Sequence, residues 1–126
     1  MNRKEAFARY GAKLANAMWA VSARLPDKVV MSLWSDHFEQ GRLEVYRDRV
    51  SRWSGAGNSL FRKHLQEALD EGLPIDLVKA TSPNPGAVER GEDASQFKNS
   101  FSVRPELVGA VESFDGDEFV IRFRQR

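Results

Sequence analysis

The stretch Lys28–Trp34 reads KVVMSLW, and it indicates the fold class more clearly than any other part of the chain. It follows a Pro-Asp turn at residues 26 and 27, and it is almost continuously apolar. A short run of this kind, rich in residues that favour strands, is typical of a strand covered on both faces. We therefore expect this segment to lie in the centre of a β-sheet rather than at its edge.

Before this strand, apolar residues recur at intervals of three and four, as on one stripe of a helix. They are Phe7, Tyr10, Leu14, Met18, Val21 and Leu25. Because Pro26 stops a helix, the spacing predicts one over residues 3–25. The opposite face carries four basic or polar positions that either meet solvent or contact phosphate: Arg3, Lys4, Arg9 and Lys13.

After the strand, residues 42–50 alternate as a further strand would, although a short helix fits as well. The alternation places Leu43 and Val45 on the inner side and Tyr46 on the outer side. Residues 54–58 read SGAGN, a loop that we expect to end with Asn58 as the N-cap of a second helix. Gly72 would then supply the left-handed position that ends this helix.

The remainder of the chain predicts mainly strands. Residues 73–81 read LPIDLVKAT, a strand entered through a proline. Residues 82–95 are rich in proline, glycine and charge without apolar periodicity, which indicates a mobile loop. Residues 107–124 predict a hairpin around a turn at 114–117, with three alternate aromatic or aliphatic residues facing the core: Phe119, Ile121 and Phe123.

These elements fit one α+β domain over residues 1–126, since a chain of 126 residues is long enough to bury its own core. We expect a small curved mixed sheet or partial barrel, packed by two main helices. The chain has no cysteine, which excludes disulfides and thiolate chemistry. It shows neither a signal-peptide pattern nor an apolar run that could span a membrane, so we expect a cytoplasmic protein without membrane contact.

Charge is distributed unevenly along the chain. Residues 1–64 carry 12 basic and 6 acidic side chains, whereas residues 65–126 carry 7 and 12, so the halves differ as +6 and −5. Such a split indicates either a basic face for an anionic partner or two halves that attract each other.

The sequence offers little for catalysis or cofactors. Its two histidines, His37 and His64, lack the spacing of a metal site or of a nucleophile with its base, so we expect no metal and no cofactor. The glycine loop before the second helix could offer N–H groups to an anion, but it lacks the ending of a P-loop.

One segment combines aromatic and basic residues, as surfaces that bind nucleic acid do. Indole faces can stack on bases while guanidinium groups bind phosphate. The candidate ligand-binding residues are Trp53, Asn58, Trp34, Ser54 and Gly57, and the candidates for contacts with the nucleic-acid backbone are Arg47, Arg49, Arg52, Arg62 and Lys63. The alternative is that the tryptophans belong to the core, which is favoured for Trp34 on its apolar strand.

The order of these features resembles the PUA-like superfamily, in particular its EVE and YTH-type readers. The resemblance covers about residues 29–80, with VVMSLW followed by RWSGAGNSLFRKHLQEALDEGLPIDLVKA. It implies a small curved sheet or barrel and a flipped, often methylated base held in an aromatic cage. Trp53 would form one wall with Asn58 beside it, Trp34 a second wall, and Phe97 or Phe101 a third; the long N-terminal helix departs from the family pattern.

Three functions follow from these observations. The leading hypothesis is a non-catalytic module that binds DNA or RNA and recognises one base, modified or unmodified. A second is an adaptor domain whose charged surface binds a protein partner or a second copy of itself. A third is a protein, with or without catalytic activity, that binds a nucleotide-like molecule at the glycine loop.

Overall fold

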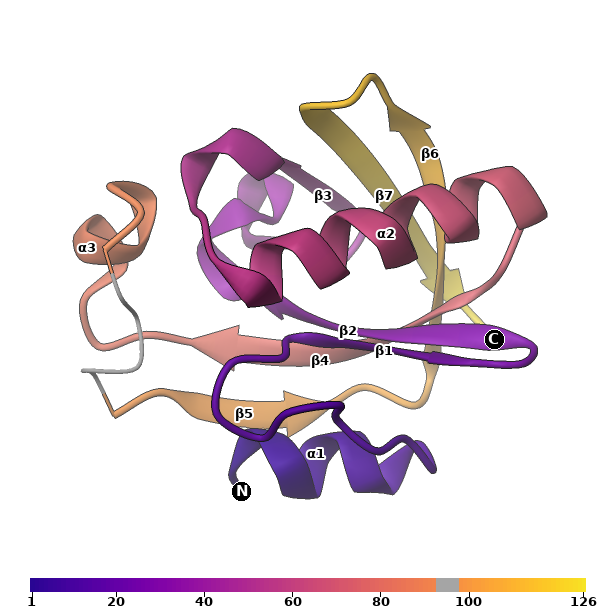
Figure 1. Cartoon of the computed structure of the whole chain (residues 1–126), viewed down its shortest axis with the longest axis horizontal. Coiled ribbons are helices and arrows are strands. Elements are labelled where there is room, and N and C mark those ends of the chain that lie inside the picture. The colour runs from indigo at the N-terminus through magenta and orange to yellow at the C-terminus, as the bar shows by residue number, and fades with distance from the viewer. Residues whose placement is uncertain (93–97) are drawn as a thin grey trace.

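A computed structural model of the chain describes residues 1–92 and 98–126 (Figure 1). Its helices are α1 (Arg3–Arg9), α2 (Ala56–Glu71) and α3 (Pro85–Glu89), and three short 3-10 turns are η1 (Ser35–His37), η2 (Glu39–Gly41) and η3 (Val50–Arg52). Its strands are β1 (Ser22–Leu25), β2 (Lys28–Trp34), β3 (Val45–Arg49), β4 (Ile75–Thr81), β5 (Ser100–Val103), β6 (Leu107–Phe114) and β7 (Glu118–Gln125).

The strands form one open, mixed sheet in the order β1-β2-β4-β6-β7-β3, and β5 also pairs with β4. Strands β2 and β4 run parallel, from Val29 opposite Ile75 to Trp34 opposite Ala80, and the other pairs are antiparallel. The predicted α+β class and mixed sheet are therefore confirmed. The sheet does not close into a barrel, because β1 and β3 remain as its two ends.

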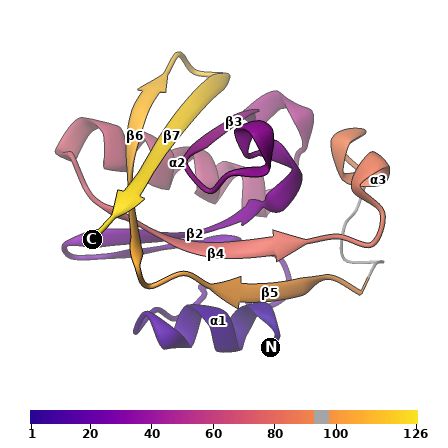
Figure 2. The same ribbon diagram turned by 180° about the vertical axis from the view of Figure 1, so that it is seen from behind.

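Strand β2 is covered on both faces, which explains its continuous apolar sequence. Val29, Met31 and Leu33 belong to the core cluster under α2, whereas Val30 belongs to a second cluster with α1. The two helices thus cover opposite faces of the sheet, with α1 lying along β5 (Figures 1 and 2). The prediction of a central strand is confirmed.

The C-terminal hairpin is also confirmed. Strands β6 and β7 pair from Leu107 opposite Gln125 to Phe114 opposite Phe119. The three residues expected to face the core, Phe119, Ile121 and Phe123, are all buried.

The prediction of one helix over residues 3–25 is wrong. Helix α1 ends at Arg9, and Gly11 follows with a φ of 75°, a conformation that does not continue a right-handed helix. Residues 22–25 instead form β1, because pairing with β2 satisfies their backbone groups in the sheet. Two residues of the stripe, Phe7 and Leu14, are nevertheless buried in the same cluster, whereas Met18 is exposed.

The middle of the chain differs from the prediction at three points. Residues 45–49 form the strand alternative, but Tyr46 points inward and is 1% exposed. Helix α2 begins at Ala56 with Gly55 as its N-cap, so Asn58 lies inside the first turn, while Gly72 ends the helix in the left-handed conformation as expected. Helix α3 lies in the segment predicted as a loop, of which residues 93–95 fall outside the described residues.

In the described part of the chain, no helix has the length and apolarity needed to cross a membrane.

Helix α2 is joined to β1 by a buried polar contact. His64, which is 7% exposed, lies with its Nδ1 2.8 Å from the hydroxyl of Ser22. Burial lowers the pKa of His64 below its ordinary value of 6.5, because the charged imidazolium is poorly solvated there. The neutral ring is the form that the fold favours.

We expect acidification to weaken the fold through His64. Between pH 7 and 5.5, the unfolded chain takes up a proton at His64 more readily than the folded chain does, so the free energy of unfolding should fall. The substitution His64→Gln should flatten this decline, since glutamine can bond Ser22 without titrating. Urea unfolding of both proteins at several pH values measures this fall in unfolding free energy. If the free energy fell equally with pH in both proteins, His64 would not be its cause.

Candidate aromatic ligand-binding cavity

All three tryptophans of the chain line one cavity of about 520 Å³. Trp19 precedes β1, Trp34 ends β2, and Trp53 follows η3, so three separate segments supply the walls. Trp19 is 41% exposed and the other two are half-buried. All three indoles are therefore partly exposed where they line the cavity, so solvent can reach this aromatic lining.

Trp53 is held by the helix behind it. Its ring meets Phe61 of α2 edge-on, with ring centroids 5.8 Å apart and an angle of 64° between the planes. Phe61 is buried in the core cluster that Trp53 borders. Trp53 therefore has a fixed orientation, with part of its ring toward the cavity.

Trp19 is held by a close approach of two backbones. A Cβ added to Gly57 would lie 2.4 Å from the carbonyl oxygen of Trp19, so only glycine fits at this position of α2. The segment 16–20 is also fixed from within, because the Asn16 side chain accepts a hydrogen bond from the N–H of Met18 at 2.8 Å. Arg3 of α1 donates through Nη2 to the Ala17 carbonyl at 2.9 Å.

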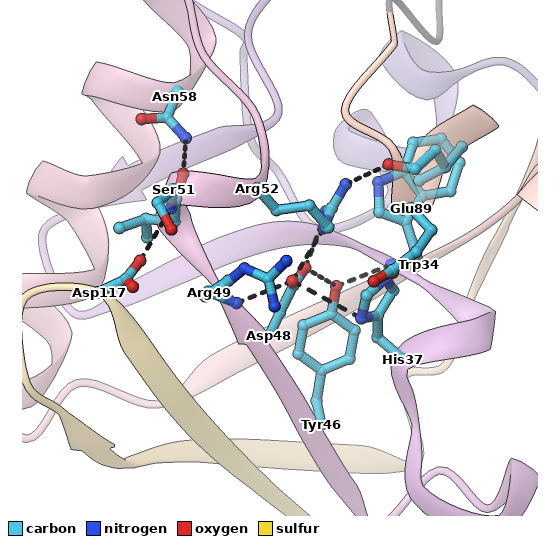
Figure 3. A network of polar contacts seen from close by, with 12 residues as sticks. Trp34, His37, Tyr46, Asp48, Arg49, Ser51, Arg52, Asn58, Glu89 and Asp117 are labelled. Atoms are coloured by element: carbon cyan, nitrogen blue, oxygen red, sulfur yellow. Dashed lines mark hydrogen bonds and ion pairs between the residues drawn. The ribbon is translucent and has the colours of Figure 1, made fainter. Parts of the chain in front are cut away.

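A buried ion pair, drawn in Figure 3, contributes both of its residues to the lining of the cavity. Arg52 donates through Nε and Nη2 to the two carboxylate oxygens of Asp48, at 2.9 and 2.8 Å. Both side chains are only 4% exposed. Arg52 donates through Nη1 to the Val88 carbonyl at 2.7 Å, which connects the pair to α3.

The same carboxylate reaches two further elements. The Tyr46 hydroxyl donates to Asp48 at 3.2 Å and accepts from the backbone N–H of Trp34 at 3.3 Å. His37 lies 3.6 Å from Asp48 and 3.1 Å from Glu89 (Figure 3). Asp48 thus links β3, η1 and the end of β2.

The ionisation states of this network follow from its burial. Burial acts to lower the pKa of Arg52, but the hydrogen bonds and charge of Asp48 outweigh it and raise the pKa. Burial, with the Asp48 charge second, raises the pKa of Tyr46 well above its ordinary value. Asp48 and Arg52 therefore cancel each other's charge, and Tyr46 is a neutral hydrogen-bonding group.

Arg3 is the remaining cation of the lining. The acidic Glu92 also lines the cavity, but it accepts a hydrogen bond from Arg90. Arg3 forms no ion pair within the described residues, where its buried Nε also lacks a hydrogen-bond partner. Burial lowers the pKa of Arg3, so the charge of this group is poorly compensated by solvent.

Four of the five ligand-binding residues predicted from sequence line the cavity: Trp34, Trp53, Ser54 and Gly57. Asn58 does not. It is 4% exposed, donates through its side-chain nitrogen to the Val50 carbonyl at 2.8 Å, and accepts from Arg62 Nε at 2.7 Å. Its side chain fixes η3 against α2, so it is not free to read a base edge.

The basic residues predicted to bind phosphate fall into two groups. Arg52 lies in the lining, but its donors are engaged by Asp48 and Val88. The other four are exposed and lie outside the lining: Arg47, Arg49, Arg62 and Lys63.

Sequence reasoning missed Trp19. Its spacing in the apolar stripe assigned the neighbouring Met18 to a helix, whereas the segment is a hydrogen-bonded turn that presents both side chains to the cavity. Of the two phenylalanines proposed as a third wall, Phe101 lines the cavity and Phe97 falls outside the described residues. The only signal in the sequence was that a second large apolar residue, Trp19, lies directly beside Met18 and off the apolar stripe.

Neither histidine lines the tryptophan cavity. His64 bonds Ser22, and His37 lines a second hollow on the other side of Asp48, which also contains Arg47, Arg49 and Glu118. Residues 1–92 and 98–126 contain no group of three or more histidine or carboxylate side chains that could hold a metal ion.

Comparisons with protein-family models, with curated proteins and with solved structures found no match for this chain. The resemblance to the PUA-like superfamily therefore remains a prediction. Fold and site define the class: an open-sheet α+β domain with a three-tryptophan cavity.

We expect Gly57→Ala to disturb the cavity. A Cβ at this position collides with the Trp19 carbonyl, and overpacking of this kind typically costs about 1–3 kcal/mol. The tryptophan emission of the folded protein should change as Trp19 moves. Ser59→Ala, an exposed site on the same helix, is the control and should leave the emission unchanged; the same spectrum for both variants would contradict the role of Gly57.

We expect Arg52→Met to destabilise the fold by about 3–5 kcal/mol, because it leaves the Asp48 carboxylate buried without its partner. The matched control is Arg47→Met, which breaks an exposed pair with Glu39 and should cost about 0–1 kcal/mol. Urea unfolding compares the two. Equal losses of unfolding free energy would show that the buried pair does not hold this wall.

Proposed function

We propose that this protein is a nucleic-acid-binding module that takes one base, modified or unmodified, into the tryptophan cavity without reacting with it. The observation that carries the proposal is the convergence of Trp19, Trp34 and Trp53 on one cavity. Base stacking on aromatic side chains contributes about 1–3 kcal/mol per base. A volume of about 520 Å³ lies within the usual range for small-molecule sites.

The charge of the lining favours a base over a methylated ammonium group, the other ligand that aromatic cages bind. A cage for a cation gains from uncompensated carboxylates. Here Asp48 is neutralised by Arg52, and Arg3 adds a positive charge without an ion-pair partner among the described residues. A neutral aromatic ligand with hydrogen-bond acceptors suits this environment better.

The polar groups of the lining would orient the bound base in the cavity. The backbone at the N-terminus of α2 lines the cavity through Ser54, Gly55 and Ala56. The N-cap residue is Gly55, so no side chain caps the N–H groups of the first turn. Edges of nucleobases carry both donors and acceptors, so backbone groups and Arg3 can pair with them. The proposal is one of binding alone, since the described lining has no histidine near its serines.

The exposed basic residues of the N-terminal half would attract the phosphates of the nucleic acid. Arg49, Arg62 and Lys63 are exposed and form no ion pair with a described residue. Contacts between such groups and phosphates make binding weaken as salt is added. We expect affinity to fall steeply with salt if the partner is a nucleic acid.

The test is a titration followed by tryptophan emission. The probes are single-stranded and duplex DNA and RNA oligonucleotides, unmodified or carrying one N6-methyladenine or 5-methylcytosine, with tetramethylammonium as the cation. We expect at least one oligonucleotide to quench the emission in a salt-dependent way and tetramethylammonium to have no effect. Quenching by the cation alone would contradict the proposal, as would no response to any oligonucleotide.

Removal of one wall should weaken this binding selectively. Trp19→Ala removes a side chain that is 41% exposed, so it should lower affinity roughly 5- to 150-fold while the melting temperature changes little. Trp53→Ala should lower affinity similarly and also destabilise, because Trp53 packs on Phe61. Binding to a labelled oligonucleotide and thermal unfolding measure the two effects.

The control for these variants is Phe114→Ala. Phe114 is a partly buried aromatic residue that contacts Phe119 but lies outside the tryptophan cavity. It should lower stability and leave affinity unchanged. Loss of affinity in Phe114→Ala equal to that in Trp19→Ala would assign the effect to general destabilisation.

A further inference from the structure

We infer that Met18 is a wedge that enters a nucleic-acid duplex and fills the gap left by the base in the cavity, so the partner is double-stranded. The inference rests on the proposed function and extends it from the base to its surroundings.

Met18 is 82% exposed and also lines the tryptophan cavity, so it lies at the rim. The described residues include only three large, exposed apolar side chains, and Met18 and Trp19 are two of them. Exposing adjacent apolar side chains to water is unfavourable, and covering them with a ligand would lower the free energy. Trp19 forms part of the cavity wall, whereas the unbranched apolar side chain of Met18 is largely exposed at the rim.

The backbone beneath Met18 is fixed. Its N–H donates to the Asn16 side chain, and the N–H of Ala20 donates to the Asn16 carbonyl at 2.9 Å. The carbonyl of Ala17 accepts from Arg3, and the carbonyl of Trp19 lies against Gly57. The backbone that carries the Met18 side chain is therefore already ordered, so binding need not order this segment of backbone.

The chain around this turn has the charge that a duplex attracts. Residues 1–20 carry four basic side chains, Arg3, Lys4, Arg9 and Lys13, and one acidic side chain, Glu5. Glu5 is used in the capping box of α1, where it accepts from the N–H of Asn2 at 3.0 Å. Lys4, Arg9 and Lys13 are exposed and form no ion pair within residues 1–92 and 98–126.

A duplex from which one base has been turned out contains a gap that the Met18 side chain can fill. To bring one base into a cavity, a protein turns the nucleotide out of the stack and loses its stacking and pairing energy. Apolar side chains such as methionine, inserted between base steps, are a known way in which proteins hold unstacked DNA. A single strand leaves no such gap, so Met18 should matter for duplex binding alone.

The experiment compares Met18→Ala with the conservative Met18→Leu. Affinities are measured for duplex and single-stranded DNA carrying one N6-methyladenine or 5-methylcytosine, with 2-aminopurine beside the modified base as a fluorescent reporter of unstacking. We expect Met18→Ala to weaken duplex binding about tenfold and to abolish the 2-aminopurine enhancement, while single-strand affinity changes less than twofold. Met18→Leu should retain both.

Several outcomes overturn the inference. Equal effects on duplex and single strand, or no effect on either, would remove the wedge role of Met18. Binding of single strands alone by the unaltered protein would leave the proposed function intact and overturn only this inference. No binding of any oligonucleotide would overturn both. Sedimentation showing a dimer that Met18→Ala dissociates would assign the exposed methionine to a second copy of the chain.

Discussion

The buried ion pair between Asp48 and Arg52 is the interaction on which the tryptophan cavity depends. It joins β3 to the turn that precedes Trp53, and through Val88 and Tyr46 it reaches α3 and the end of β2 at Trp34. Two desolvated charges are tolerated only when their hydrogen bonds are satisfied, as they are here. The pair therefore holds two of the three aromatic walls in a defined relation, and because its two charges cancel, Arg3 is the charge of the lining that no described ion pair compensates.

The open sheet provides the space that this pair organises. Strand β4 pairs with β6 at its start and with β5 at its end, so the β6–β7–β3 portion diverges from β2 (Figures 1 and 2), and the tryptophan cavity is lined by residues of β2, β3, β7 and the N-terminal turn of α2. Side chains from β2, η3 and the 16–20 turn converge there. Gly57 completes the arrangement, since its lack of a side chain lets the Trp19 backbone reach α2.

Sequence patterns predicted the elements whose local signal agrees with their tertiary role. KVVMSLW, the hairpin and Gly72 behave as expected because burial, turn chemistry and backbone conformation point the same way. The predicted helix over residues 3–25 was wrong because Gly11 adopts a left-handed conformation after α1 and because residues 22–25 pair with β2 despite their helical spacing. Tyr46 was assigned outward because alternation cannot reveal that its hydroxyl has a buried acceptor in Asp48. Trp34 and Trp53 were recognisable as candidates, but their meeting with Trp19 depends on contacts distant in sequence.

The most direct measurement of the central claim is a ¹H–¹⁵N NMR titration that follows the three indole N–H signals of the tryptophans. An oligonucleotide that binds with one base in the cavity should shift all three signals along curves with a common dissociation constant. If the signals shifted independently, or if binding left one of the three unchanged, the tryptophans would not enclose one ligand, and the account would be contradicted.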